Sequence, residues 1–136
     1  MEWHIYVDGA SSGNPGESGA GIVIFNESGQ ELFRDSIYLG HMTNNMAEYE
    51  ALVRALKKAY QSSVENLYIY TDSLLVANQI TGKYKIKNQE LMKYAETAMT
   101  MIKYFNNFTL KYIPREKNTL ADKLAKNAAC KKGVDG

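Results

Sequence analysis

The first stretch of the chain alternates between apolar and polar positions. Ile5 and Val7 point to one side of an extended backbone, and Asp8 points to the other. The segment GASSGNPG then breaks the alternation, and its glycines, serines and asparagine predict a loop. The pattern therefore predicts a strand over residues 2–9 that delivers the carboxyl group of Asp8 to a glycine-rich loop.

Short apolar runs and stretches of helical periodicity fill the rest of the chain. Runs at 19–25 and 31–39 predict two more strands, which complete an antiparallel meander with the first. The other predicted elements, in order, are a helix over 46–60, a strand over 67–71, a short helix ending at 80, a helix from 88 or 89 to 104, a strand over 107–113 and a helix over 120–131. This order predicts one α/β domain over residues 1–136, a mixed sheet covered by helices, with the last few residues frayed. The residues expected to cap helices are Asn44 or Asn45, Asp72, and Asn118 or Thr119.

Four acidic residues recur at comparable places in these elements. Asp8 and Asp72 each follow an apolar strand. Glu48 is expected in the first turn of its helix, on the apolar face that also carries Leu52, where packing gives no reason for an acid. Asp122 comes near the start of the last helix, on a face of small residues. Each position also has an ordinary interpretation as a turn residue, a helix cap or a first-turn acid.

Four carboxylates at strand ends and helix starts suit a site for hard divalent cations. Mg²⁺ prefers oxygen ligands and binds through a few carboxylates together with water and substrate phosphate. Two such ions roughly 3.5–4 Å apart can activate water and stabilise a leaving oxygen in phosphodiester cleavage. The sequence has no His/Cys cluster for zinc, no GxSxG elbow and no P-loop lysine in its glycine-rich segment.

Charge and cysteine content narrow the class of protein further. The net charge of the 136 residues is +1, but residues 1–66 carry 4 Lys/Arg against 9 Asp/Glu, and residues 67–136 carry 12 against 6. A basic half facing an acidic cluster fits a metal-dependent phosphate enzyme, and a solvated face is the plainer alternative. Cys130 is the only cysteine, so no internal disulfide partner is expected. With no signal peptide or membrane span in the pattern, a cytoplasmic protein is expected.

Four segments of the chain, taken in order, resemble the motifs of type 1 ribonuclease H. They are VDGASSGNPG with Asp8, TNNMAEYEAL with Glu48, YTDS with Asp72 and PREKNTLADKLA with Asp122. Each motif alone is weak, but the ordered set is specific and covers nearly the whole chain. The resemblance implies the ribonuclease H-like fold, an α/β fold with helices on both faces of a five-stranded mixed sheet in the order 3-2-1-4-5. It also implies an endoribonuclease that cuts the RNA strand of RNA–DNA hybrids and leaves 5′-phosphate and 3′-hydroxyl ends.

The resemblance also assigns roles to residues by their place in these motifs. Asp8, Glu48, Asp72 and Asp122 would be the catalytic residues and would hold two Mg²⁺ ions, or Mn²⁺ in their place. The partner that the resemblance implies is an RNA–DNA hybrid, whose 2′-hydroxyl groups need polar contacts, and the protein is expected to act as a monomer. The expected substrate contacts are Gly9, Ser11, Ser12, Gly13, Asn14, Thr43, Asn44, Asn45, Ser73 and Arg115, and the candidate contacts to the DNA strand are Lys83, Tyr84, Lys85 and Lys87.

Two features depart from the family pattern. Many members carry a Trp-rich basic protrusion where this chain has only TGKYKIKNQE, so weaker hybrid binding is expected because fewer cations release fewer counterions. Many members also place a mobile His before the last helix, where this chain reads PREKN. Arg115 is the candidate substitute that positions water or releases product. A phosphate-contacting or merely solvated arginine is the alternative, as an exposed basic loop is for residues 83–87.

Two other functions stay open at the level of sequence. A relative that binds hybrids without cutting them would have no need of all four acids, yet a small loss of geometry can silence such a site. A resolvase-like or integrase-like DNA nuclease would share the fold, but Asn44, Asn45 and the loop at 11–14 favour hybrid recognition. Metal-dependent turnover tests the first alternative, and a preference for DNA-only substrates would support the second.

Overall fold

A mixed five-stranded sheet forms the centre of the molecule. In the computed structural model, which describes the backbone of residues 1–134 and the side chains of residues 1–130, the strand order is β3-β2-β1-β4-β5. The central strand β1 (Glu2–Ser11) pairs antiparallel with β2 (Gly16–Asn26), which pairs antiparallel with β3 (Glu31–Met42). On its other side β1 pairs parallel with β4 (Asn66–Thr71), and β4 pairs parallel with β5 (Asn107–Tyr112). The expected sheet order is confirmed.

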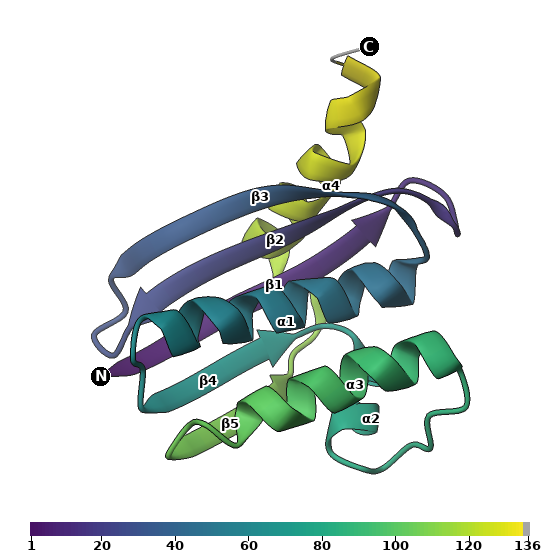
Figure 1. Ribbon diagram of the computed structural model, residues 1–136. Helices are drawn as coiled ribbons and strands as arrows, with labels where there is room; N and C mark the ends of the chain where they lie inside the picture. The colour runs from purple at the N-terminus through teal and green to yellow at the C-terminus, as the bar shows by residue number, and fades with distance from the viewer. Residues whose placement is uncertain (135–136) are drawn as a thin grey trace.

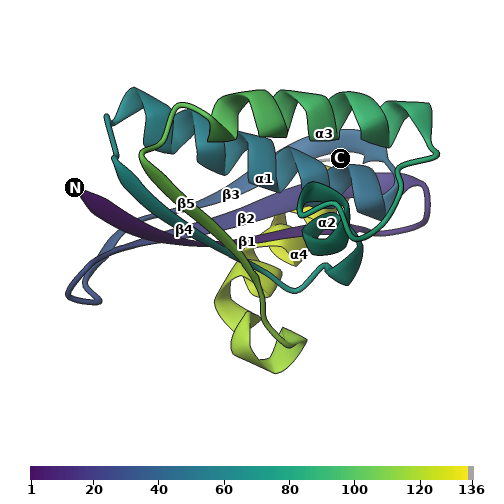
Figure 2. The same ribbon diagram turned by 90° about the horizontal axis from the view of Figure 1, so that it is seen from below.

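Helices cover both faces of this sheet, as expected. The helices are α1 (Asn44–Gln61), α2 (Leu74–Ile80), α3 (Gln89–Ile102) and α4 (Thr119–Val134), and a single 3₁₀ turn, η1 (Arg115–Lys117), precedes α4. Figures 1 and 2 show α1 and α3 side by side on one face and the start of α4 on the other. The last helix runs past its predicted end at residue 131 and includes Gly133 and Val134, so the expectation that the tail 133–136 is frayed is wrong for these two residues. Residues 135–136 lie outside the described part of the chain.

The alternation in β1 sorts its side chains between the two faces. Ile5 and Val7 are buried in the core against α1, which contributes Leu52 and Leu56. Burying such side chains stabilises the fold by about 1.5–3 kcal/mol each. The strands β1 and β2 are longer than predicted, because the glycine-rich segment continues the pairing as far as Ser11. The tight connection at residues 12–15 therefore begins close to Asp8.

Glycines let α4 lie directly on the sheet. A Cβ atom on Gly19 would overlap the backbone of Ala125, and one on Gly21 would overlap the backbone of Ala121. Only glycine permits so close an approach of helix and strand. Since Asp122 follows Ala121 in the first turn of α4, this contact fixes the height of its carboxylate above the sheet.

Two helix caps differ from the prediction. Thr43, rather than Asn44 or Asn45, caps α1, because its side-chain oxygen accepts the N–H of Met46. Ser73, rather than Asp72, caps α2 by accepting the N–H of Val76. In each case the hydroxyl group of the neighbouring residue, Thr43 or Ser73, reaches the free N–H group three residues further along the chain. The carboxylate of Asp72 is therefore not used as a cap.

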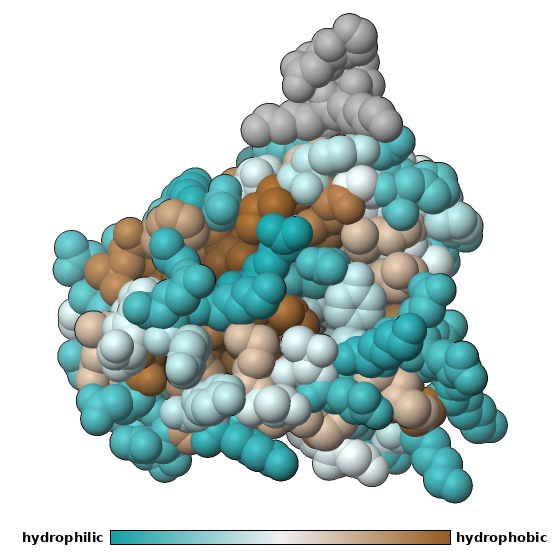
Figure 3. Space-filling model, in the orientation of Figure 1, coloured by the Kyte–Doolittle hydropathy of each residue, from teal (hydrophilic) through white to brown (hydrophobic). Residues whose placement is uncertain are grey.

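The outer strand β3 is less covered than the rest of the sheet. Helix α1 packs mainly on β1, and Leu32 and Phe33 of β3 are exposed. Figure 3 shows hydrophobic side chains gathering over this part of the face that carries α1. The ammonium group of Lys58 lies 4.3 Å above the ring of Phe33 and shields part of it. Within residues 1–134, no helix has both the length and the apolar character needed to cross a membrane.

Candidate active site

The parallel pairing of β1 and β4 brings two acids together. Tyr6 lies opposite Tyr70 and Val7 opposite Thr71, so the next position on each strand is an aspartate, Asp8 or Asp72. Asp8 also lies opposite Gly21 of β2, whose missing side chain faces α4. Paired positions share a face of the sheet. Asp8 therefore points toward α4 while its neighbours on the strand enter the α1 core.

The third acid comes from α1, which approaches β1 closely. A Cβ atom on Gly9 would overlap the backbone of Ala47 and Glu48, and the N–H of Gly9 donates to Glu48 Oε1 at 2.7 Å. Glu48 is 7% exposed, as its place on the apolar face predicts. It is the fifth residue of the helix, so the expectation that it lies in the first turn is wrong. The helix dipole, which acts within the first turn, does not explain its burial.

Asp8, Glu48 and Asp72 form a compact carboxylate cluster. One oxygen from each lies within 4.8 Å of the others. Burial, followed by the negative charges of Glu48 and Asp72, raises the pKa of Asp8 well above its usual value. Burial also raises the pKa of Glu48, and the N–H of Gly9 opposes that rise. Charges that repel one another in a buried site are stabilised by a cation.

Asp122 lies at the edge of this cluster. Its Oδ2 atom forms an ion pair with Nζ of Lys126, which lies 3.0 Å away and one turn further along α4. Burial raises the pKa of Asp122, but hydrogen bonding with Asp8 and with Lys126 outweighs burial and lowers it. The structure thus brings all four predicted acids to one place, with three in close contact and the fourth paired to a lysine.

A pocket of about 260 Å³, the pocket over the carboxylates, is lined by Asp8, Glu48 and Asp122, whereas Asp72 lies outside its lining. It contains many of the residues that were predicted to contact substrate. Ser11 and Ser12 line one side, and Asn44 at the start of α1 lines another. Asn14 holds the loop against α1, because its side-chain oxygen accepts the N–H of Asn44 at 3.0 Å. The full lining is Asp8, Gly9, Ala10, Ser11, Ser12, Asn44, Glu48, Arg115, Asp122, Lys126, Ala129 and Cys130.

Other predicted contacts lie outside this lining. Thr43 and Ser73 cap helices, and Ser73 is buried. Gly9 does line the pocket, but its main-chain N–H is engaged by Glu48. The candidate contacts to the DNA strand, residues 83–87, form the connection between α2 and α3 and are largely exposed. Contacts from these residues, and from Gly13 and Asn45, to a substrate stay predictions.

Three residues of the site were missed by sequence reasoning. Lys126 has a local signal, since it lies one helical turn after Asp122. Cys130 was considered as the single cysteine without a disulfide partner, and its exposed side chain lines the pocket. Asn118 was expected only to cap α4, but its side-chain nitrogen donates to Asp72 Oδ2 at 3.1 Å. No local pattern indicates that last contact, because the two residues are 46 positions apart.

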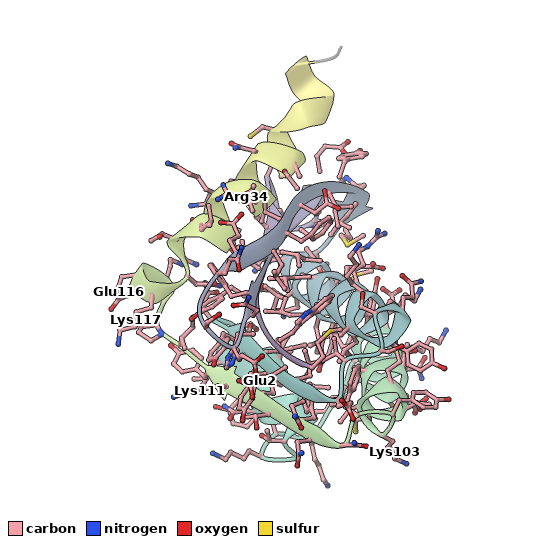
Figure 4. The ribbon with its side chains drawn as sticks, turned by 90° about the vertical axis from the view of Figure 1, so that its left-hand side faces the viewer. Glu2, Arg34, Lys103, Lys111, Glu116 and Lys117 are labelled. Atoms are coloured by element: carbon pink, nitrogen blue, oxygen red, sulfur yellow. The ribbon has the colours of Figure 1, made fainter. Side chains whose placement is uncertain are left out.

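A larger hollow, of about 490 Å³, lies beside β1, β2 and the start of α4. Its lining includes Tyr6, Phe25 and Lys117, and Figure 4 shows Lys117 and Glu116 projecting outward from η1. Within residues 1–134, the acidic group able to surround a metal ion is the cluster of Asp8, Glu48 and Asp72, which this hollow does not contain. Chemistry rather than size therefore identifies the smaller pocket as the candidate active site.

Comparisons with known proteins agree with this geometry. The profile of the family described as reverse transcriptase-like matches residues 6–128. A bifunctional protein of Mycobacterium tuberculosis is 34% identical over 129 residues, which are 94% of this chain and 35% of that protein. Ribonuclease HI of Halobacterium salinarum is 34% identical over 92% of this chain and 63% of its own length. The chain thus spans between about a third and two thirds of these curated relatives.

Solved structures show the same arrangement. The crystal structure of RNase H1 from Halobacterium salinarum superposes with a TM-score of 0.91 at 34% identity, covering 94% of this chain and 97% of that one. LC11-RNase H1, solved in complex with an RNA/DNA hybrid, gives a TM-score of 0.89 at 38% identity, covering 96% and 98%.

Proposed function

The chain belongs to the reverse transcriptase-like, ribonuclease H-like family, and from that membership we propose that it is an endoribonuclease that cleaves the RNA strand of RNA–DNA hybrids. The observation that carries the proposal is the cluster of the buried Asp8 and Glu48 with the partly buried Asp72, with one oxygen of each within 4.8 Å of the others. Such a cluster is costly to fold and has no role in packing. The hybrid complex of the similar LC11-RNase H1 supports the choice of substrate.

The donor set fits hard divalent cations. All the candidate ligands are carboxylate oxygens, which Mg²⁺ and Mn²⁺ prefer over nitrogen or sulfur. Asp8, Glu48 and Asp72 would hold the metal, with Asp122 at the edge of the site. When bound, two such ions would supply an activated water and would stabilise the leaving 3′ oxygen, and the expected products would carry 5′-phosphate and 3′-hydroxyl ends.

The walls of the pocket suit the recognition of RNA. Ser11, Ser12 and Asn44 offer hydroxyl and amide groups beside the carboxylates. A 2′-hydroxyl group is both donor and acceptor, so polar groups of this kind can distinguish RNA from DNA. Arg115 brings a positive charge to the same pocket, and we assign it to the reacting phosphate or its water. All these groups come from one chain, which supports action as a monomer.

The cleavage assay uses purified protein and an end-labelled RNA strand. The strand is presented alone, paired with DNA and paired with RNA, each with Mg²⁺, with Mn²⁺ or with EDTA. Asp8→Asn removes a charge from the cluster, and Asp35→Asn is the matched control, because Asp35 is exposed on β3. We expect cutting of the hybrid alone, lost with EDTA and with Asp8→Asn and kept with Asp35→Asn.

The other outcomes separate the alternatives. Binding of the hybrid without cutting in either metal would replace the enzyme by a binding protein of the same family. Cutting of duplex DNA in preference to the hybrid would point to a DNA nuclease.

The single cysteine suits a reducing compartment, so the cytoplasm is the location we propose. A loss of activity on oxidation of the protein would be consistent with that location.

A further inference from the structure

One buried asparagine, Asn118, forms hydrogen bonds with three of the chain segments that carry the acids. Asn118 lies just before α4 and is 2% exposed. Its side-chain nitrogen donates to the main-chain oxygen of Val7 at 2.9 Å and to Asp72 Oδ2 at 3.1 Å. Its main-chain oxygen accepts the N–H of Asp122 at 3.1 Å. Asn118 therefore contacts Asp72 directly, the residue before Asp8, and Asp122 itself.

The orientation of this amide follows from its neighbours. Both atoms near the side-chain nitrogen are oxygens that can only accept, so a flipped amide would place oxygen against oxygen. The Oδ1 atom of Asn118 is buried and has no hydrogen-bond partner among the described residues. A capping asparagine would use that oxygen to accept an N–H from the first turn of its helix. Donation to Val7 and Asp72, rather than capping, is thus what the side chain does.

We propose that Asn118 is a positioning residue that holds the Asp72 carboxylate in the orientation required by the cluster. Asp72 lies beside Asp8 and Glu48, and like charges favour its rotation away from them. A neutral amide fixes one oxygen of Asp72 without adding a positive charge that would compete with a cation. Because the same nitrogen also bonds the main chain of Val7, it sets the separation of the β1 and β4 ends.

Loss of the amide should affect the metal site more than the substrate site. Asn118 is 2% exposed and does not line the pocket over the carboxylates, although it lines part of the larger hollow, so we expect it to act on Asp72 rather than on a bound hybrid. Groups that orient metal ligands typically change metal affinity or activity by about 10–100-fold when they are removed. The effect on kcat rests on the proposed function, whereas the effect on metal affinity does not.

The test compares Asn118→Leu, which keeps the buried volume, and Asn118→Ala with the wild type. Asn88→Ala is the matched control, because Asn88 caps α3 by accepting the N–H groups of Glu90 and Leu91. Calorimetry measures Mn²⁺ affinity without nucleic acid, kinetics give kcat and KM for a hybrid, and all assays run below each melting temperature. We expect Mn²⁺ affinity and kcat to fall by about 10–100-fold in both Asn118 variants, with KM close to the wild-type value. Asn88→Ala should lower only the melting temperature.

Other results would contradict the positioning role of Asn118 or separate it from the proposed function. Wild-type Mn²⁺ affinity in both variants would show that the amide is merely structural, even if the melting temperature falls. Asn118→Ser keeps one donor, so an affinity no better than that of Asn118→Ala would also contradict the proposal. If the wild type binds Mn²⁺ but cuts no hybrid, the proposed function fails while the Mn²⁺ comparison still tests Asn118. Absence of Mn²⁺ binding by the wild type would overturn both.

Discussion

Asp8 carries the largest electrostatic cost in the site. Its carboxyl group is buried on the α4 side of β1, next to Glu48 and Asp72. Burial and these two charges raise its pKa, so the folded protein retains a proton that the unfolded chain releases. The free energy of unfolding of the metal-free protein therefore falls as pH rises from about 4, the usual pKa of an aspartate, toward the raised value. The metal-free protein is therefore less stable at the higher pH values, where the carboxyl group of Asp8 is closer to losing its proton and binding a cation.

Asp8→Asn should stabilise the metal-free protein because it removes the charge but keeps the shape. We expect its melting temperature in EDTA at pH 8 to exceed that of the wild type by roughly 4 °C or more. The difference should shrink toward pH 4, since each pH unit changes the linked free energy by at most about 1.4 kcal/mol per group. Thermal melts between pH 4 and pH 8 measure it, with Asp35→Asn as control.

Added metal should reverse this order. Mn²⁺ or Mg²⁺ binds the folded state and should raise the wild-type melting temperature with increasing concentration. The Asp8→Asn variant should respond much less. An equal response of both proteins, or a variant that melts lower than the wild type in EDTA at pH 8, would show that Asp8 is not the centre of the cluster.

Arg115 is expected to act on turnover rather than on folding. It lines the pocket with Asp8 and Glu48, and it precedes Glu116 and Lys117, which project outward in Figure 4. We expect Arg115→Ala to lower kcat for hybrid cleavage at least about tenfold, since it removes positive charge from the site where charge develops. Lys117→Ala, in the same 3₁₀ turn but outside this pocket, is the control.

The kinetic parameters distinguish the roles of Arg115. A raised KM with unchanged kcat would make it a phosphate contact in the ground state. Unchanged kcat and KM would leave it a solvated arginine and remove it from the site.

At the scale of elements, close contacts between helices and strands place the acids. Gly9 admits α1 to β1, and its N–H fixes Glu48. Gly21 admits α4 to β2 and so sets the position of Asp122. Protein interiors are close-packed and transmit such shifts. Substitutions at these glycines should therefore disturb the cluster without touching an acid.

Gly21→Ala tests this coupling of α4 to the sheet. The added methyl group would overlap the backbone of Ala121, so we expect a loss of about 1–3 kcal/mol in the free energy of unfolding. The Mg²⁺ concentration for half-maximal activity should also rise, because Asp122 moves with the helix. Denaturant unfolding and a Mg²⁺ titration of activity measure the two effects.

Gly29→Ala is the matched control for Gly21→Ala. Gly29 has a φ of +84°, and no atom lies within 4 Å of the place that a Cβ atom would take, so alanine there strains only a distant turn. It should cost about 1 kcal/mol and leave the Mg²⁺ dependence unchanged. A similar Mg²⁺ shift in both variants would mean that general destabilisation, rather than the position of α4, explains the effect.

At the scale of the whole molecule, charge is divided along the chain. The first 66 residues have an excess of acids and the rest an excess of basic residues. Part of the basic excess lies in the exposed connection between α2 and α3. Lysines there would bind phosphates with release of counterions. The segment is shorter than the protrusion that the family resemblance leads us to expect here, so we expect few phosphate contacts from it.

Replacing Lys83, Lys85 and Lys87 together by alanine should weaken hybrid binding. The slope of log K against log salt should become shallower by roughly 0.9 for each lost phosphate contact, and kcat at saturating hybrid should stay unchanged. Binding is measured in EDTA at several salt concentrations. The control is Lys103→Ala with Lys111→Ala, two lysines labelled in Figure 4 that lie at the C-terminal end of α3 and on β5, away from the connection between α2 and α3.

A salt slope that the triple variant leaves unchanged would make residues 83–87 an exposed loop without contacts. A wild-type slope as steep as that of a relative with the protrusion would contradict the expectation of weaker binding.

The elements and the identity of the acids could be predicted from the order of residues in the chain. Periodicity is a local property, so the strand around Ile5 and the helix that carries Glu48 follow from neighbouring positions. The family motifs then indicated the strand order. The residues that cap the helices were predicted less well. Thr43 and Ser73 replaced the expected caps, because adjacent polar residues compete for the same free N–H groups.

How the acids meet depends on the assembled fold. The bond from Gly9 to Glu48, the bridge from Asn118 to Asp72 and the pairing of Asp122 with its lysine require a particular strand register and helix approach. The first two join residues 39 and 46 positions apart, beyond any local pattern. The raised pKa values of Asp8 and Glu48 follow from the same packing, because their carboxyl groups become buried and close to other carboxylates only once the sheet and helices have assembled.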